Sequence, residues 1–453
     1  MIMATSGLVT SISSYAIPFK VPGSQHDRQI LHYFSVQGSY EVAGWFNADF
    51  WTRTVFQQSH RDPVVRHALI SLGMLHLNYT TTHVSEPNTA GSDTLRQYGK
   101  ALRTLRRRLG KVDSEAKRTA LTCCILFYCV EAALGNEIAA TSHLENGLSL
   151  LASIDPGERT EEFSALERVL EGLDLQATLF DDERKPRLDL MPDINRGNCS
   201  TDATSAGAFC NLDEAHRALV ILQNQLFHFL TENTPYKSHT IDSLPANLLL
   251  QKRDLLERFT SWSNQFDHLK NTNSQDEGTV CGIQISLIHW QTSVMLLEAD
   301  YPANDSVFNA TSDPRTEEVL NLADNLLEHT GRNGKPASTR SNVRRNLSCE
   351  NGIVAPLFML AMKCTAEHVC DRATVLLAAS QRREGLYDAQ NMVAAIQQFV
   401  TARQRKKLQF QEQWKKPLAG MSLEKTFESE LNGASVSMDK IAECLKPAFS
   451  TLL

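Results

Sequence analysis

Residues Thr119–Ser153 read TALTCCILFYCVEAALGNEIAATSHLENGLSLLAS, and this stretch decides the fold class. Its first half is apolar on nearly every side, which is typical of a helix that is buried on several faces. Gly135 and Asn136 interrupt the pattern in the way that one helix ends and the next begins. The apolar residues of the second half fall on one helical stripe: Ile138, Leu144, Leu148 and Leu151. The stretch therefore predicts two helices that fold back on each other.

Helical patterning of this kind recurs along most of the chain. Asp62 and Pro63 open one helix, because Asp suits the N-cap and Pro suits the first helical position. Further helices are predicted at residues 95–109, 163–180, 212–230, 248–268, 279–298, 316–329, 354–370, 372–380 and 386–404. No segment alternates apolar and polar residues as a half-buried strand does, and no repeat of fixed length is present. The sequence predicts an all-α fold, in which irregularly stacked helical hairpins form one large body.

Composition divides the chain into three parts. Residues 1–26 are a loose, Ser-rich lead-in, and residues 27–404 form the helical domain. Within that domain, residues 181–207 are rich in Asp, Asn, Ser and Gly, which favours an exposed connection between two halves. Residues 405–453 are a charged segment that ends in a C-terminal helix.

Charge balance and cysteine usage narrow the class of protein. The chain has 45 Lys and Arg against 52 Asp and Glu, and this net charge of −7 argues against a nucleic-acid coat protein. The ten cysteines include no C-x-x-C pair, so we expect reduced, buried thiols in an intracellular protein. The N-terminus lacks the features of a secretory signal or transit peptide, and no apolar run is long enough to span a membrane. We therefore predict no membrane contact.

Motifs of catalytic and cofactor sites are incomplete in this sequence. Gly331–Pro336 has the wrong spacing and residues for a phosphate loop. His143 and Glu145 echo the H-x-E of zinc deaminases, but no P-C-x-x-C follows, and a polar helix edge is the better interpretation. The remaining candidate metal ligands are not spaced as in a helical zinc site: His60, His67 and His76. We predict that the chain is not an enzyme and has no catalytic, cofactor-binding or metal-binding residues.

Two basic clusters are candidates for contact with phosphate groups or with the nuclear-import machinery. The first consists of Arg103, Arg106, Arg107 and Arg108. The second consists of Arg403, Arg405, Lys406 and Lys407. A solvated helix face is the simpler interpretation of either cluster, and both interpretations stay open.

The segment Arg382–Asp388, RREGLYD, is unusual because it places charges and a glycine between apolar helices. One interpretation is a helix junction, in which Gly385 supplies a turn and the charges pair locally. The alternative is a ligand-binding elbow.

Several blocks of the sequence, in order, resemble a known family. They are GWFNADFWTRTVFQQSHRDPVVRHALISLGMLH at 44–76, CCILFYCVEAALGNEIAATSHLENGLSLL at 123–151, LEGLDLQATLF at 170–180, FCNLDEAHRALVILQNQLFHFL at 209–230 and GIVAPLFMLAMKCTAEHVCDRATVLLAASQRREGLYDA at 352–389. Together they are similar to the fungal-specific transcription factor domain, the regulatory region of fungal binuclear zinc-cluster transcription factors. The resemblance implies an all-helical body in a nuclear protein that controls transcription. In fungi, such regulators often govern secondary-metabolite gene clusters or nutrient use.

The sequence departs from the family pattern at the DNA-binding module. That module normally begins with C-x2-C-x6-C and holds two zinc ions, whereas residues 1–122 contain no cysteine. No zinc ligand is therefore carried over, and we do not expect these residues to read DNA sequence directly. The resemblance implies protein partners instead, either co-regulators or a DNA-binding dimer partner, with a homodimer as one arrangement.

Two functions from different classes follow from the sequence. The first is a transcriptional regulator of fungal gene expression, for example of a secondary-metabolite cluster, that acts through its helical domain. The alternative is a metabolite-sensing module or a protein-interaction scaffold without a role on DNA. The sequence feature that best supports this alternative is a group of aromatic residues near His60, namely Phe46, Phe50 and Trp51. Such residues are more often part of the core. A cavity lined by buried polar groups would favour a ligand, whereas a filled core would favour the regulator.

Overall fold

The computed structural model describes most of the predicted helical domain. The described residues are 22–81, 91–108, 114–155, 157, 161–181, 184–190, 209–237, 239–272, 277–309, 313–331 and 345–414. The predicted lead-in up to residue 21, most of the connection 181–207 and the predicted C-terminal helix lie outside the described residues. The described part is dominated by helices, which confirms the all-α class.

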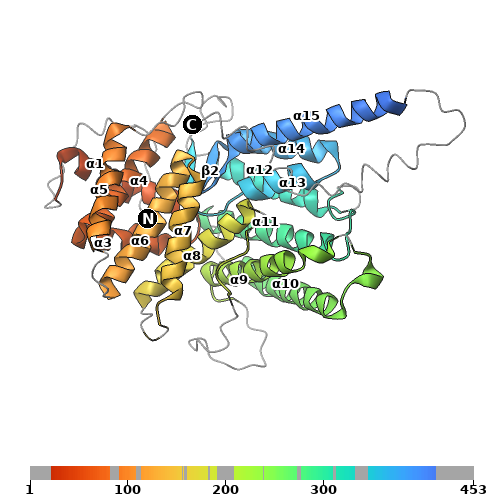
Figure 1. The fold of residues 1–453 in the computed structure, drawn as a ribbon, viewed down its shortest axis with the longest axis horizontal. Coiled ribbons are helices and arrows are strands. Elements are labelled where there is room, and N and C mark those ends of the chain that lie inside the picture. The colour runs from red at the N-terminus through yellow and green to blue at the C-terminus, as the bar shows by residue number, and fades with distance from the viewer. Residues whose placement is uncertain are drawn as a thin grey trace, which may run out of the picture.

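The helices are arranged in two groups along the chain (Figure 1). The N-terminal group contains α1 (Gln25–Tyr33), α2 (Ser39–Ala43), α3 (Val55–Arg61), α4 (Pro63–Thr81), α5 (Ser92–Arg108), α6 (Ser114–Leu134), α7 (Glu137–Ala152) and α8 (Glu161–Phe180), with π-helical turns η2 (Phe34–Gly38) and η3 (Phe50–Thr54). The C-terminal group contains α9 (Leu212–Glu232), α10 (Ala246–Thr272), α11 (Glu277–Ala299), α12 (Arg315–Gly331), α13 (Val354–Lys363), α14 (Glu367–Ser380) and α15 (Ala389–Trp414), with short 3-10 turns η5 (Thr234–Tyr236) and η6 (Ile241–Ser243). In Figure 1, α8 lies where the two groups meet, and α15 extends past the rest of the body.

The predicted hairpin of α6 and α7 is confirmed and belongs to the core of the N-terminal group. Gly135 adopts a φ of +78° between the two helices, which glycine reaches without strain. The predicted stripe of α7 was wrong at Ile138, whose side chain is 87% exposed. At 100° per residue, Ile138 points about 120° away from Leu144, so Ala140, only about 40° from Leu144, takes the core position instead.

The predicted start of α4 is also confirmed. A carboxylate oxygen of Asp62 accepts a hydrogen bond from the backbone N–H of Val64 at 2.8 Å, as an N-cap residue does. Near the C-terminus, the predicted break between two helices falls earlier than expected. It lies between Lys363 and Glu367, so α14 begins upstream of the predicted Arg372.

A small sheet joins the two helical groups, and the sequence did not predict it. Strand β1 (Asn346–Ser348) runs parallel to β2 (Arg382–Glu384), and β2 pairs antiparallel with β3 (Tyr387–Asp388). The segment Arg382–Asp388 is thus a β-hairpin and not a simple helix junction. The predicted turn and local charge pairing are nevertheless present, because Gly385 has a φ of +55° and Arg383 Nε lies 3.0 Å from Asp388 Oδ2.

Helix α11 illustrates why composition alone does not indicate a membrane segment. Among the described helices, it is long and apolar enough to cross a membrane. Two thirds of its most apolar window, 67%, is buried inside the body, where α11 packs against α9, α10 and α12. We interpret it as a core helix of the C-terminal group.

Candidate functional site

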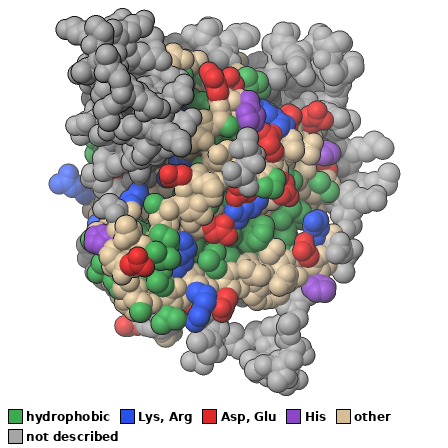
Figure 2. Space-filling model, turned by 90° about the vertical axis from the view of Figure 1, so that its right-hand side faces the viewer, with side chains coloured by type: hydrophobic (Ala, Val, Ile, Leu, Met, Phe, Trp, Pro, Cys, Tyr) green, Lys and Arg blue, Asp and Glu red, His purple; other side chains and the backbone are tan. Residues whose placement is uncertain are grey.

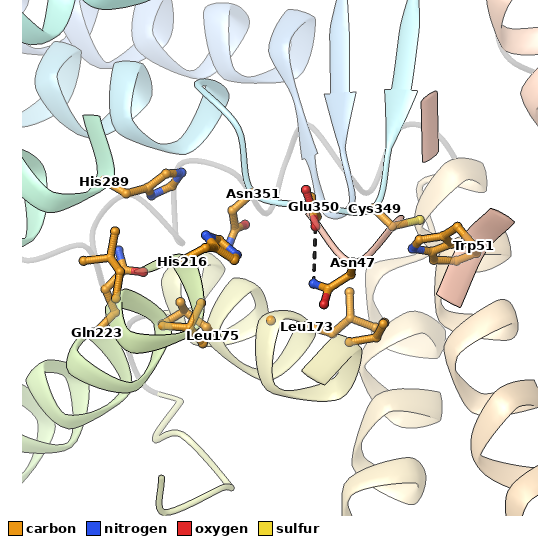
Figure 3. A pocket seen from close by; sticks show the side chains of 14 residues that line it. Asn47, Trp51, Leu173, Leu175, His216, Gln223, His289, Cys349, Glu350 and Asn351 are labelled. Carbon is orange, nitrogen blue, oxygen red and sulfur yellow. Dashed lines mark hydrogen bonds between the residues drawn. The ribbon is translucent and has the colours of Figure 1, made fainter. Parts of the chain in front are cut away.

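A small cavity lies where the two helical groups meet the sheet, and we call it the junction cavity (Figure 3). Its free volume is about 40 Å³. A single water needs roughly 10–15 Å³ by the same measure, so the cavity holds a very small solute or a few waters. It is lined by Asn47, Trp51, Val169, Gly172, Leu173, Leu175, His216, Leu219, Val220, Gln223, His289, Cys349, Glu350 and Asn351.

Glu350 holds one wall of the junction cavity in place. Its carboxylate accepts hydrogen bonds from the backbone N–H groups of Trp45 and Phe46, both at 3.1 Å, and from Asn47 Nδ2 at 3.3 Å. Burial raises the pKa of Glu350 well above its usual range, against the opposing effect of these hydrogen bonds. The turn must begin with a glycine, because a Cβ at Gly44 would lie 2.6 Å from Glu350 Oε2.

A second hydrogen-bonded chain fixes the opposite side of the same loop. Tyr128 donates its hydroxyl hydrogen to Gln176 Oε1 at 2.6 Å. Gln176 Nε2 in turn donates to Asn351 Oδ1 at 3.0 Å and to the carbonyl oxygen of Cys349 at 3.4 Å. Residues 349–351 are therefore held from α6 and α8 on one side and from the turn after α2 on the other.

Two histidines from neighbouring helices supply the polar end of the cavity. His216 of α9 stacks on Phe46 with ring centroids 3.6 Å apart and planes 3° apart. Burial lowers the pKa of His216 to about 3 and that of His289, on α11, to about 4. Both rings are therefore neutral at neutral pH, so each offers one donor and one acceptor nitrogen. His289 is 6% exposed, and its Nε2 makes no hydrogen bond of ordinary geometry among the described residues. The backbone of Asn351 and Gly352 nevertheless lies close enough to the ring to oppose the fall in its pKa.

The predicted basic clusters lie on α5 and α15, in different groups of helices (Figure 1), and none of their residues lines the junction cavity. Arg103, Arg106, Arg107 and Arg108 are exposed on α5. Arg108 also forms an ion pair with Asp62, so its charge is partly engaged within the fold. Arg403 and Arg405 are exposed on the projecting part of α15, whereas the side chains of Lys406 and Lys407 lie outside the described residues.

Surface charges are mixed at one end of the molecule. The face in Figure 2 is the end of the molecule at the right of Figure 1, and it shows acidic, basic and hydrophobic side chains interspersed. The described side chains on this face do not form a continuous basic field of the kind that binds nucleic acid.

The aromatic residues near His60 in the sequence are core residues, as their type predicts. Phe46, Phe50 and Trp51 are at most 2% exposed, and Trp51 also lines the junction cavity. His60 is exposed and lies outside the cavity lining. His143 lies at the edge of α7, where its Nε2 is 3.0 Å from the hydroxyl of Tyr98.

Sequence reasoning did not identify the polar residues that define the cavity. His216 is preceded by Asp213 and Glu214 and followed by Arg217, as on an ordinary polar helix face, and Glu350 lies in a loop without a motif. A buried polar residue inside an apolar helix is the one local signal that could have marked His289.

A family profile matches most of the N-terminal group of helices. Residues 32–176 match the sequence profile described as the fungal specific transcription factor domain. The match runs from α1 to Gln176 of α8, so it includes the α6–α7 hairpin and one wall of the cavity. The resemblance seen in the sequence is therefore confirmed for this segment.

Two curated fungal regulators are similar to this chain. The aspercryptin biosynthesis cluster-specific transcription regulator atnN of Emericella nidulans is 24% identical over 293 residues, which cover 59% of this chain and 45% of that protein. Transcription regulator lscL of Purpureocillium lilacinum is 32% identical over 155 residues, which cover 32% of this chain and 36% of that protein. The chain thus matches less than half the length of either relative. No solved structure shows a significant match.

The two histidines that line the junction cavity, the buried His289 and the half-buried His216, predict a pH-dependent stability. Below about pH 6.5 a histidine in the unfolded chain binds a proton, whereas His289 in the folded chain stays neutral down to about pH 4. The free energy of unfolding therefore falls as the pH is lowered through this window, by about 1.4 kcal/mol per pH unit for each such group.

We expect His289→Gln to make the free energy of unfolding fall less steeply as the pH is lowered. Urea denaturation at a series of pH values between 4 and 7 measures this slope. The exposed His60 is the matched control, and His60→Gln should keep the wild-type slope. An unchanged slope in His289→Gln would show that His289 is not held neutral by its surroundings.

Proposed function

We propose that these residues are the regulatory region of a fungal transcription regulator that acts in the nucleus on the genes of a secondary-metabolite cluster. The observation that carries the proposal is the match of residues 32–176 to the fungal specific transcription factor domain. The name of the Emericella relative, a cluster-specific regulator of aspercryptin biosynthesis, supports the link to secondary metabolism. The proposal involves no catalytic step.

In this proposal the helical body acts through protein contacts. A partner, either a co-regulator or a DNA-binding protein, supplies or reads the DNA contact, and a second copy of the chain is one candidate for that partner. The mixed surface charge of Figure 2 is compatible with protein contacts.

A reporter assay tests the proposal directly. The chain is fused to a heterologous sequence-specific DNA-binding domain and expressed in a fungal host whose reporter carries the matching sites. We expect the reporter transcript to change several-fold relative to the DNA-binding domain alone, because a regulatory region works when brought to a promoter. A folded, nuclear fusion that leaves the transcript unchanged would contradict the proposal.

The basic cluster on α15 is our candidate for the nuclear-import signal. Its Arg403 and Arg405 are exposed on a helix that extends past the body, where an acidic receptor surface can reach them. Arg108 of the α5 cluster is instead engaged by Asp62. Replacing Arg403, Arg405, Lys406 and Lys407 by Gln should lower the nuclear-to-cytoplasmic ratio of a fluorescent fusion several-fold.

The matched control is the triple Gln variant of the α5 cluster at Arg103, Arg106 and Arg107, which should stay nuclear. Loss of nuclear signal only in this second variant would assign import to α5. Nuclear retention in both variants would exclude either cluster as the signal.

A second candidate function, control by a small effector, is favoured by one observation. His289 lines the junction cavity and is only 6% exposed, and its Nε2 makes no hydrogen bond of ordinary geometry among the described residues. A neutral imidazole there suits a small neutral ligand with a hydroxyl or amide group, because an anion or cation would meet no compensating charge from the ring. Such an effector would join the two helical groups at the place where Glu350 and Gln176 already connect them.

A further inference from the structure

Two cysteines that are far apart in the sequence meet next to the junction cavity. Cys129 of α6 and Cys349, which follows β1, are separated by 220 residues along the chain, and their sulfur atoms lie 2.7 Å apart. Both are free thiols in this structure. A disulfide bond places its sulfurs about 2.05 Å apart, so a short approach would bring these two within bonding distance.

The backbone on the Cys349 side is already fixed close to α6. The N–H of Cys349 donates to the carbonyl oxygen of Val42 at 3.0 Å, and the N–H of Gly385 donates to that of Ser348 at 2.8 Å. The carbonyl oxygen of Cys349 also accepts from Gln176 Nε2 at 3.4 Å. These hydrogen bonds hold the loop in place, so the Cys349 sulfur stays close to the Cys129 sulfur.

The two thiols differ in their access to solutes. Cys349 lines the junction cavity, whose volume of about 40 Å³ accommodates a solute as small as hydrogen peroxide. Cys129 is 2% exposed and does not line that cavity. Burial, together with the hydrogen bond to Cys349, raises the pKa of Cys129 well above its usual range, so Cys129 is a poor first nucleophile.

We propose that Cys129 and Cys349 are a peroxide-sensitive thiol pair, in which a small hydroperoxide entering the junction cavity oxidises Cys349 and Cys129 then resolves it to a disulfide. In the first step the Cys349 sulfur attacks one peroxide oxygen and the O–O bond breaks. The products are a sulfenic acid on Cys349 and, for hydrogen peroxide, one water that carries the thiol proton.

In the second step the Cys129 sulfur attacks the sulfur of that sulfenic acid. The S–S bond forms, the S–O bond breaks, and the hydroxyl leaves as a second water with the proton of Cys129. The two thiols together lose two electrons, and the peroxide gains them. The bond would tie α6, in the N-terminal core, to the loop that leads into α13, and so lock the junction between the two helical groups.

Peptide mapping of the intact chain tests the proposal. The protein is treated with hydrogen peroxide, its remaining thiols are alkylated under denaturing conditions, and the digest is analysed by mass spectrometry. We expect a peptide that contains Cys349 to be linked to one that contains Cys129, and a reductant to release the link. The melting temperature of the oxidised protein should rise by about 5 °C, because the bond closes a very long loop.

Variants and an internal marker make the result decisive. Cys129→Ser should abolish the linked peptide and leave Cys349 as a sulfenic acid that a dimedone probe traps, whereas Cys123→Ser, another buried thiol of α6, should keep the link. Cys210 is exposed and reports that the peroxide has acted. If Cys129→Ser does not fold, the peptide map and the melting temperature of the oxidised wild-type protein still show whether the link between Cys129 and Cys349 forms. Full alkylation of Cys349 after Cys210 is oxidised, or a link from Cys349 to Cys123 or Cys124, would overturn the proposal.

Discussion

The junction of this protein depends on one buried carboxylate, that of Glu384 in β2. It accepts hydrogen bonds from the backbone N–H groups of Gly352, Ile353 and Val354, at 3.0, 3.1 and 2.9 Å, and so caps the N-terminus of α13. Burial raises the pKa of Glu384, while Arg382, at 3.9 Å, and the three N–H donors oppose that shift. A buried carboxylate without these partners would cost several kcal/mol, so the strand and the helix are constrained to meet.

Most features of the junction follow from that contact. With β2 fixed against α13, its partner β1 delivers Cys349, Glu350 and Asn351 to the space between the helical groups. Glu350 then binds the turn at residues 45–47, and Gln176 of α8 holds the same loop from the other side. The junction cavity and the Cys129–Cys349 contact are consequences of this arrangement. The Cys129–Cys349 contact joins the segment that the family profile matches to residues beyond that segment.

The sequence predicted the parts of the fold that depend on local periodicity. The α6–α7 hairpin, the Asp62 cap and the turn at Gly385 were all visible as patterns within a few residues. The sheet was not, because its strands are two or three residues long and are too short to show alternation. The cavity was not visible either, since it depends on Glu350 reaching a turn 305 residues earlier in the chain. Such contacts are set by tertiary packing, so no pattern of neighbouring residues in the sequence predicts them.

Native-state hydrogen exchange in Glu384→Gln tests the central role of this carboxylate most directly. The amide keeps the shape of the side chain but removes the charge and points N–H donors toward backbone donors. Glu367→Gln, an exposed first-turn residue of α14, is the matched control. We predict that the amides of Gly352, Ile353 and Val354, together with those of β1 and β2, exchange at least tenfold faster only in Glu384→Gln, because about 1.4 kcal/mol or more of local stability is lost. Equal protection of these amides in the wild type and Glu384→Gln would contradict the account.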